Sequence, residues 1–155
     1  MTETKADTAA DIRRAAGLLG GPTVLGHPLR EWLDVHEILL QGLPGTALQH
    51  FVDSLIVTTS AAISEALGMS RRTLQRRLNI PEMTLRRKQS ERLWTFAYIV
   101  AKATTALGSQ ERAENWMTTP RASVRGLRPI DLLASPVEID IVENLLERAC
   151  WGWPA

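Results

Sequence analysis

The stretch SAAISEALGMSRRTLQRR, residues 60–77, decides the fold of this chain. Its pattern predicts a helix, a turn at Gly68 and a second helix. Ser70 is placed to cap the second helix, because its hydroxyl can accept a hydrogen bond from the backbone N–H of Thr73. Apolar residues recur at the spacing that lets the two helices share one contact. They are Ile63, Leu67, Met69, Leu74 and Leu78.

The outer face of the second helix carries side chains suited to DNA. Leu74 and Leu78 lie four residues apart and face inward, which turns the opposite side of the helix outward. Arginine can pair with guanine, glutamine with adenine, and serine or threonine with phosphate. We expect base or groove contacts from Arg72, Thr73, Gln75 and Arg76, and phosphate contacts from Ser70 and Arg71. The alternative is a solvated helix pair whose arginines provide solubility.

Two further basic features allow two interpretations each. Arg77 points partly back toward the helical bundle, so an ion pair with Glu91 and a contact with DNA phosphate are both compatible with its position. Arg86, Arg87 and Lys88 form a charge run that is typical of a solvated turn. Their alternative role is a phosphate contact that adds affinity without sequence information.

The distribution of charge supports a polyanionic partner. The chain has 155 residues, 18 basic and 17 acidic, for a net charge of +1. Between positions 70 and 92 there are eight basic and two acidic residues, which leaves ten basic and fifteen acidic residues elsewhere. The positive field is therefore confined to one segment, as in an electrostatic footprint on nucleic acid.

Several classes of function are not supported by the composition. The single Cys150 excludes an internal disulfide and is interpreted as a small buried apolar group in a cytoplasmic protein. His27, His36 and His50 share no ligand spacing, so we expect no metal site. No catalytic triad, glycine-rich phosphate loop, membrane span or signal peptide is present in the pattern. We therefore expect neither an enzyme nor a bound cofactor.

The residues before the helix pair predict short helices. Residues 1–10 are interpreted as a disordered tail and residues 11–19 as one short helix, within a flexible N-terminal segment at 1–17. A second helix is predicted at 29–41, where Leu33, His36 or Glu37, and Leu40 recur. A third is predicted at 46–55, and its shared apolar face consists of Leu48, Phe51, Val52 and Leu55.

The residues after the helix pair predict a longer helical region. Ser90 is expected to begin the strongest helix, at 91–107, and Ser109 to cap the next, at 110–117. Residues 118–129 have the composition of a loop, followed by a short helix at 130–133 and a longer one at 136–149. Apolar residues in this last helix are spaced by four; they are Val137, Ile141, Leu145 and Ala149.

The tryptophans divide into two pairs. Trp94 and Trp116 lie in amphipathic helices, so we expect them to pack inward. Trp151 and Trp153 lie within five residues of the end of the sequence, where an exposed tryptophan favours a protein interface. We expect this pair and the terminal carboxylate to fill a cleft of a partner protein, with the carboxylate where a phosphate would meet arginine.

Three groups of residues, in this order, resemble a known family. The first comprises residues 18–21, 24–26 and 42–44; the second comprises residues 67–77 and 90–92. The third comprises Ala113, Trp116, Met117, Pro120, Arg128, Pro129, residues 131–133 and residues 142–146. The order is similar to that in the Xre/MbcA/ParS-type antitoxins that are partnered with RES-domain toxins. The similarity covers nearly the whole chain, from about residue 16 onward.

The resemblance implies an all-α fold, with an Xre-like helix-turn-helix bundle at 18–108 and a small helical toxin-binding domain at 109–155. It also implies repression of the protein's own operon and occlusion of the active-site cleft of a toxin that uses NAD. The residues that it assigns to toxin binding are Trp116, Met117, Arg128, Pro129, Leu132, Leu133, Trp151, Trp153, Pro154 and Ala155. The sequence departs from the family's pattern at 120–126 and in its terminal Trp-Gly-Trp.

We expect operator DNA and a cognate toxin as partners, and a homodimer within the toxin complex, because two recognition helices read two half-sites. Two alternatives are a stand-alone transcription factor whose C-terminal region dimerises, and an adaptor whose helix-turn-helix no longer binds DNA.

Overall fold

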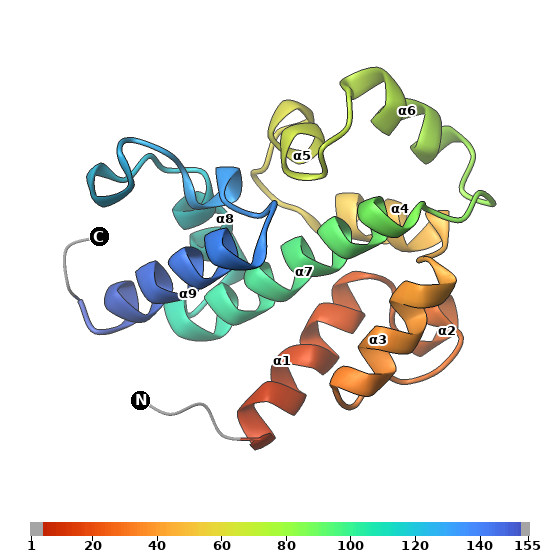
Figure 1. Ribbon diagram of the computed structural model, residues 1–155, viewed down its shortest axis with the longest axis horizontal. Coiled ribbons are helices and arrows are strands. Elements are labelled where there is room, and N and C mark those ends of the chain that lie inside the picture. Colours follow the sequence, from red (N-terminus) through yellow and green to blue (C-terminus); the bar gives the residue numbers. More distant parts are fainter. Residues whose placement is uncertain (1–4, 153–155) are drawn as a thin grey trace.

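The computed structural model describes residues 5–152 and contains only helices, turns and loops in that range (Figure 1). In chain order the helices are α1 (Lys5–Leu18), α2 (Gly21–Leu25), α3 (Trp32–Gln41), α4 (Gly45–Ser54), α5 (Ser60–Ala66), α6 (Arg71–Asn79), α7 (Arg87–Leu107), α8 (Gln110–Met117), the short 3-10 turns η1 (Ala122–Val124) and η2 (Pro129–Asp131), and α9 (Pro136–Cys150). The all-α prediction is confirmed.

Helix α7 organises the molecule because other helices cover nearly all of its length. It packs against α1 and α3 on one side and against α8 and α9 on the other (Figure 1). Residues 96–101 are buried without interruption. The aromatic rings of Phe96 and Phe51 meet edge to face with centroids 4.8 Å apart, a favoured geometry that ties α4 to α7.

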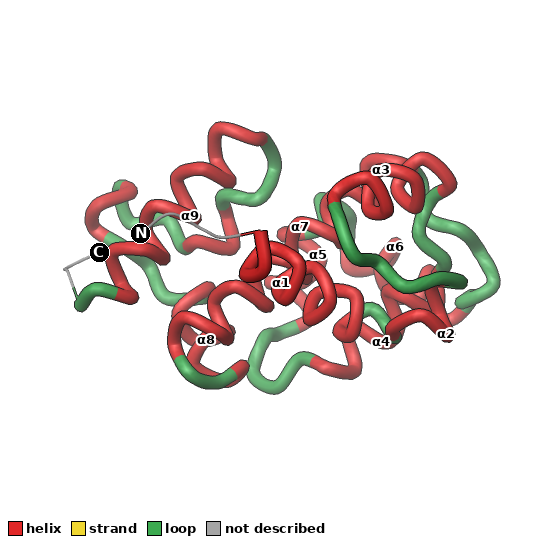
Figure 2. The backbone as a smooth tube through the Cα atoms, turned by 90° about the horizontal axis from the view of Figure 1, so that it is seen from below, coloured by secondary structure: helices red, strands yellow, loops and turns green. Residues whose placement is uncertain are grey.

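The N-terminal segment differs from the prediction of a flexible tail at 1–17. Helix α1 begins at Lys5, and Ile12, Ala15 and Ala16 are buried. Seen from below, α1 crosses the middle of the molecule against α7 (Figure 2). Alanine is the best helix former, and its small side chain lets two helices approach closely. The predicted helix at 11–19 is therefore confirmed as the buried part of α1, whereas residues 5–10, predicted as part of a disordered tail, extend the same helix.

One predicted apolar stripe, in α3, faces solvent, and another, in α9, does so in part. In α3, Leu33 and Leu40 are exposed, whereas Val35 and Ile38 are buried. In α9, the buried residues are Val142, Leu145 and Leu146, and the stripe of four that was predicted is partly at the surface. Each of these helices carries more apolar residues than one face can hold. Periodicity alone therefore cannot identify the face that packs on the core.

The start of α7 also differs from the prediction. The helix begins at Arg87, so Ser90 is not its cap but a buried residue in its first turn. The Ser90 hydroxyl accepts a hydrogen bond from the Leu43 backbone N–H at 2.9 Å, which fixes the start of α4 against α7. Gly45 lies in the same crowded region: a Cβ there would be 2.6 Å from the carbonyl oxygens of Pro81 and Met83. Only glycine fits this close approach.

The structure also describes the predicted loop before α9 and the surroundings of Cys150. Residues 118–135 form a loop, and the short helix predicted at 130–133 is the 3-10 turn η2. Cys150, in the last turn of α9, is exposed, which corrects its interpretation as a buried group. Within residues 5–152 no helix has the length and apolar character needed to cross a bilayer. The same residues hold no cluster of His, Cys, Asp and Glu arranged for a metal ion.

Candidate DNA and toxin interfaces

Helices α5 and α6 form the predicted helix-turn-helix. The Ser70 hydroxyl accepts a hydrogen bond from the Thr73 backbone N–H at 3.0 Å, which confirms the predicted cap of α6. Gly68 adopts a φ of +67°, a left-handed conformation that glycine tolerates best. A Cβ at Gly68 would lie 2.7 Å from the guanidinium of Arg92, which also donates to the Ala66 carbonyl at 3.4 Å. The turn is thus pressed against α7.

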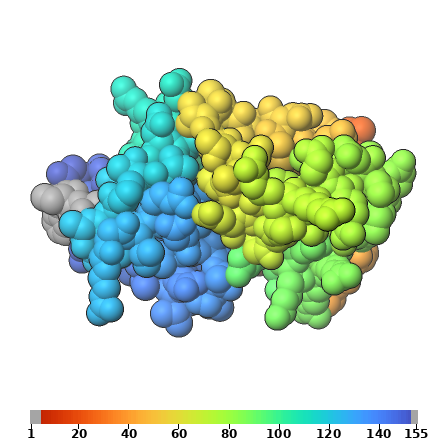
Figure 3. Space-filling model, turned by 90° about the horizontal axis from the view of Figure 1, so that it is seen from above, coloured from red at the N-terminus to blue at the C-terminus, as the bar shows by residue number. Residues whose placement is uncertain are grey.

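The outward face of α6 carries the predicted DNA-binding set. Leu74 is buried, and the side chains of Arg71, Arg72, Gln75 and Arg76 are exposed. The Ser70 hydroxyl donates to Thr73 Oγ1 at 2.9 Å, so the capping residue and the first turn are held together. In the space-filling view, α5 and α6 lie on the upper surface of the molecule, where side chains of α6 project toward the viewer (Figure 3). Six of the seven predicted residues therefore lie together on or beside one accessible surface.

Arg77 is the exception in this set. It is 5% exposed, its Nη1 lies 3.9 Å from the sulfur of Met83, and its Nε has no hydrogen-bond partner in the described part of the chain. Glu91 pairs with Arg87 at 3.1 Å instead of with Arg77. The predicted ion pair is therefore wrong, and the burial of Arg77 removes it from the exposed face of α6. Position 77 follows the inward-facing Leu74 by three residues, which explains its burial.

Arg86, Arg87 and Lys88 are exposed where α7 begins. They form the N-cap and first turn of α7 rather than a separate solvated turn. The ion pair of Arg87 with Glu91 is itself exposed, so it contributes little to stability and can be exchanged for other partners. Contact between this run and phosphate stays a prediction.

The residues assigned to toxin binding fall into three groups. Five are buried in the core between α7, α8, η2 and α9; they are Trp116, Met117, Pro129, Leu132 and Leu133. Burial of Trp116, like that of Trp94, confirms the expectation that both pack inward, and it means that these five do not form a direct contact surface. Trp151 is 59% exposed. Trp153, Pro154 and Ala155 lie outside the described residues.

The C-terminal region exposes apolar residues that the sequence assignment missed. Val137 and Ile141 lie one turn apart on the outer side of α9 and are 71% and 37% exposed. Leu127, in the loop before η2, is also exposed. The signal in the sequence that could have indicated these residues was a second apolar stripe in α9, displaced around the helix from the buried one. We refer to Val137 and Ile141, together with Trp151 directly after the end of the helix, as the outer strip of α9.

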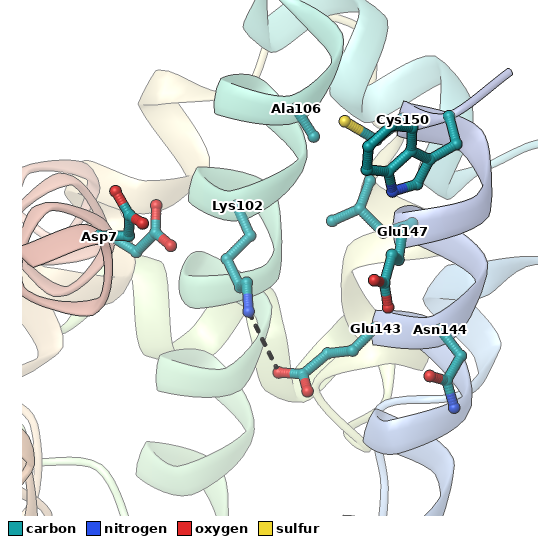
Figure 4. A pocket seen from close by; sticks show the side chains of 10 residues that line it. Asp7, Lys102, Ala106, Glu143, Asn144, Glu147 and Cys150 are labelled. Carbon is teal, nitrogen blue, oxygen red and sulfur yellow. Dashed lines mark ion pairs between the residues drawn. The ribbon is translucent and has the colours of Figure 1, made fainter. Parts of the chain in front are cut away.

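A pocket of about 300 Å³ lies between α1, α7 and α9. Four carboxylates line it, from Asp7, Asp11, Glu143 and Glu147. The ammonium of Lys102 projects among them, 3.7 Å from a Glu143 oxygen (Figure 4). Cys150 and Trp151 form part of its wall.

A buried carboxylate connects the two candidate interfaces. Glu114 on α8 is 1% exposed and accepts hydrogen bonds from the link before α5. The donors are the backbone N–H groups of Ile56, Val57 and Thr58, at 2.9 to 3.1 Å, and the Thr58 hydroxyl at 2.7 Å. Burial acts to raise the pKa of Glu114, but these hydrogen bonds, together with one from Gln110, lower it below its ordinary value. The carboxylate is therefore ionised at neutral pH.

An arginine makes a second connection. Arg128, at the start of η2, donates to Asp131 at 2.8 Å and to Glu65 on α5 at 3.1 Å. The hydrogen bond from Arg128 is the main reason that the pKa of Asp131 is lowered. Arg128 was assigned to toxin binding, yet in this structure its guanidinium is engaged with α5 and η2.

Comparison with known families matches two regions of the chain. Residues 34–98 match the "Antitoxin Xre-like helix-turn-helix domain", and residues 102–152 match the "Antitoxin Xre/MbcA/ParS C-terminal toxin-binding domain". The chain belongs to the Xre/MbcA/ParS-type antitoxins. The resemblance stated from the sequence is therefore confirmed at the level of the family. The two matched regions meet inside α7, so this helix serves both halves of the antitoxin.

One curated relative extends this comparison. The chain is 24% identical over 120 residues to a protein named Antitoxin Xre from Pseudomonas putida strain KT2440. The matched part covers 77% of this chain and 73% of the relative. The combination of a helix-turn-helix with a toxin-binding domain identifies an antitoxin of a toxin–antitoxin system.

Proposed function

We propose that this antitoxin neutralises a RES-domain toxin that uses NAD, by covering the toxin's active-site cleft with its C-terminal region, and that it represses its own operon through α6. The observation that carries the proposal is the presence in one chain of an exposed cationic helix and, on the matched toxin-binding region, the unpartnered outer strip of α9. We assign the chain no catalytic role and place its action in the cytoplasm, where its operator lies.

The DNA half of the proposal rests on α6. Arg72, Gln75 and Arg76 are exposed on α6, which supports a role in major-groove contacts, and Gln75 also donates to Asn79 at 3.0 Å. Ser70 and Arg71, at the capped first turn, are proposed to contact the phosphates. One such helix buries too little surface to bind an operator tightly. We therefore propose a homodimer within a larger toxin–antitoxin complex, so that two copies of α6 contact two half-sites.

The toxin half rests on the outer strip. Val137 and Ile141 lie one turn apart on α9, Trp151 follows its last residue, and all three expose apolar area that a partner would bury. Tryptophan is over-represented among the residues that dominate binding energy. The five buried residues first assigned to this role lie in the same core as Val142, Leu145 and Leu146, the buried residues of α9.

Co-expression with the adjacent gene product tests the proposal. If that gene encodes a RES-domain protein, it should stop growth and deplete NAD when expressed alone, and the antitoxin should restore both. A chain lacking residues 151–155 should lose neutralisation and keep operator binding. Full neutralisation by the truncated chain would contradict the role given to Trp151.

A stand-alone dimeric repressor is the second candidate, because the outer strip of α9 also fits a second copy of the chain. Sedimentation of the purified protein distinguishes the two candidate functions. Substituting Val137 with Ser would dissociate a dimer held by the strip, whereas a strip reserved for a toxin leaves the oligomeric state unchanged.

A further inference from the structure

The exposed face of α6 ends in an amide that the predicted DNA-binding set does not include. Asn79, the last residue of α6, is exposed and follows Arg72, Gln75 and Arg76 by seven, four and three residues. Residues at these spacings share one face of a helix. A hollow of about 430 Å³ lies on this face, and all four residues are among those that line it. Asn79 is therefore placed to take part in binding at this surface.

A hydrogen bond joins the side chains of Gln75 and Asn79. Gln75 Nε2 donates to Asn79 Oδ1 at 3.0 Å. Amide pairs of this kind stabilise a helix when the two residues lie four apart. Both side chains are exposed, and within residues 5–152 neither side-chain amide makes another hydrogen bond. The bond thus fixes the orientation of the Gln75 amide and leaves its remaining polar groups open to a ligand.

The bond to Asn79 decides which hydrogen-bonding groups Gln75 can offer to a base. A glutamine amide has two N–H donors and one carbonyl oxygen. Asn79 takes one donor, so one N–H and the oxygen remain. In the major groove adenine presents one acceptor, N7, beside one donor, the N6 amino group. Guanine presents two acceptors, N7 and O6, and a side chain needs two free donors to satisfy both. The paired Gln75 therefore complements adenine and not guanine.

We propose that Gln75 recognises an adenine in the operator and that Asn79 makes this recognition selective against guanine. The proposal rests on the proposed binding of operator DNA by α6 and adds the base that this site selects. Asn79 acts through Gln75, so it is a positioning residue. Without it the Gln75 amide turns freely about its last side-chain bond and can direct both N–H groups at a guanine.

The arginines on the same face explain why such a constraint is useful. Arg72 and Arg76 are exposed beside Gln75, and arginine pairs best with the two acceptors of guanine. With an unconstrained Gln75, every side chain of this group would accept guanine. The bond to Asn79 keeps one position of α6 for adenine, so that the face as a whole distinguishes the two purines.

The test measures the affinity of the full-length chain for the DNA upstream of its gene and for copies of that DNA in which each base pair is changed in turn. The base that Gln75 contacts is the one whose preference disappears in Gln75→Ala. There the unmodified chain should prefer adenine to guanine by about tenfold or more. Asn79→Ala should reduce this ratio about twofold or more by improving the binding of guanine. Direct competition between the two DNAs in one reaction measures the ratio.

A second variant separates positioning from a merely structural role. Asn79→Asp keeps an oxygen that accepts from Gln75, so it should retain the preference for adenine over guanine. Its negative charge should weaken the binding of all the DNAs alike. The matched control is Asn144→Ala, at an exposed position of α9, which lies at the opposite end of the molecule from α6 (Figure 1). It should leave both affinity and preference unchanged.

Three results would overturn the proposal while operator binding itself persists. They are a base other than adenine at the position that Gln75 contacts, an unchanged ratio in Asn79→Ala, and equal losses of preference in Asn79→Ala and Asn79→Asp. A chain that binds none of the DNAs overturns the proposed repression as well.

Discussion

Helix α6 and helix α9 each pack one side on the core and present the other to solvent, but they expose different side chains. The exposed residues of α6 include three arginines and a glutamine, whereas those of α9 include the apolar Val137 and Ile141 beside Asp140, Asn144, Glu147 and Arg148. A charged face binds a polyanion by releasing counterions, so its affinity falls as salt rises. An apolar face binds by removing hydrocarbon from water, which salt affects far less. One chain can thus hold two partners by forces that respond to different conditions.

The largest expected effect is a loss of stability that distinguishes the buried side of the C-terminal region from its exposed side. Trp116→Ala should lower the free energy of unfolding by about 3–5 kcal/mol, because it leaves a cavity in the core. Urea unfolding of the free antitoxin measures this. Val137→Ala, on the exposed side, should change the same quantity by no more than about 0.5 kcal/mol. Equal losses in the two variants would mean that α9 does not divide into a packed face and a free face.

The next effect concerns the charged face. Arg72→Ala and Arg76→Ala should each weaken operator binding by about 1–3 kcal/mol, and removing an arginine that binds phosphate should reduce the slope of log affinity against log salt by about one. Titration of operator DNA at several salt concentrations measures both quantities. Arg13→Ala, at an exposed position of α1, is the control. Unchanged affinity in a double variant of Arg72 and Arg76 would favour an adaptor that does not bind DNA.

A smaller effect is expected on the apolar face. Val137→Ser should weaken toxin binding by about 1–2 kcal/mol, because the partner no longer buries the full hydrocarbon side chain. The loss should be nearly the same in low and high salt, in contrast to the arginine variants. Calorimetric titration with the toxin at two salt concentrations checks this. A strongly salt-dependent loss would show that charges rather than apolar contact dominate this interface.

The smallest effect is a change in pH dependence at the junction between the two faces. Because the folded state lowers the pKa of Glu114, this carboxylate stabilises the fold above the ordinary pKa of glutamate. That contribution is lost as the pH falls through the lower pKa of the folded state. Glu114→Gln should therefore be less stable at neutral pH and lose less stability on acidification. Unfolding curves between neutral and acidic pH, with Glu111→Gln as control, measure the difference.

Local interactions were predictable from the sequence. The cap of α6 involves Ser70 and Thr73, only three residues apart, and the outward face of α6 follows from the inward position of Leu74. Charged residues in most cases also mark a solvent face, since they are rarely buried without a partner. The same reasoning failed at Arg77, whose long apolar stem allows burial at the edge of the core.

Interactions between distant segments were not predictable in this way. The partners of Glu114 are backbone N–H groups, which every residue except proline possesses, so no side-chain pattern reveals them. An apolar binding residue such as Val137 has the same chemistry as a core residue. The sequence consequently could not distinguish the outer strip of α9 from the buried Trp116 and Leu133. Tertiary packing alone decides between them.

Helix α7 constrains how antitoxins of this kind could exchange specificities. Because it is continuous from Arg87 to Leu107 and belongs to both matched regions, a chimaera of two antitoxins would have to be spliced inside or beside one rigid rod. Adding or removing a single residue there would rotate everything downstream by about 100° around the rod's axis. Chimaeras whose junction keeps the helical phase of α7 should combine the toxin specificity of one antitoxin with the operator specificity of the other. Chimaeras whose junction adds or removes one residue should not.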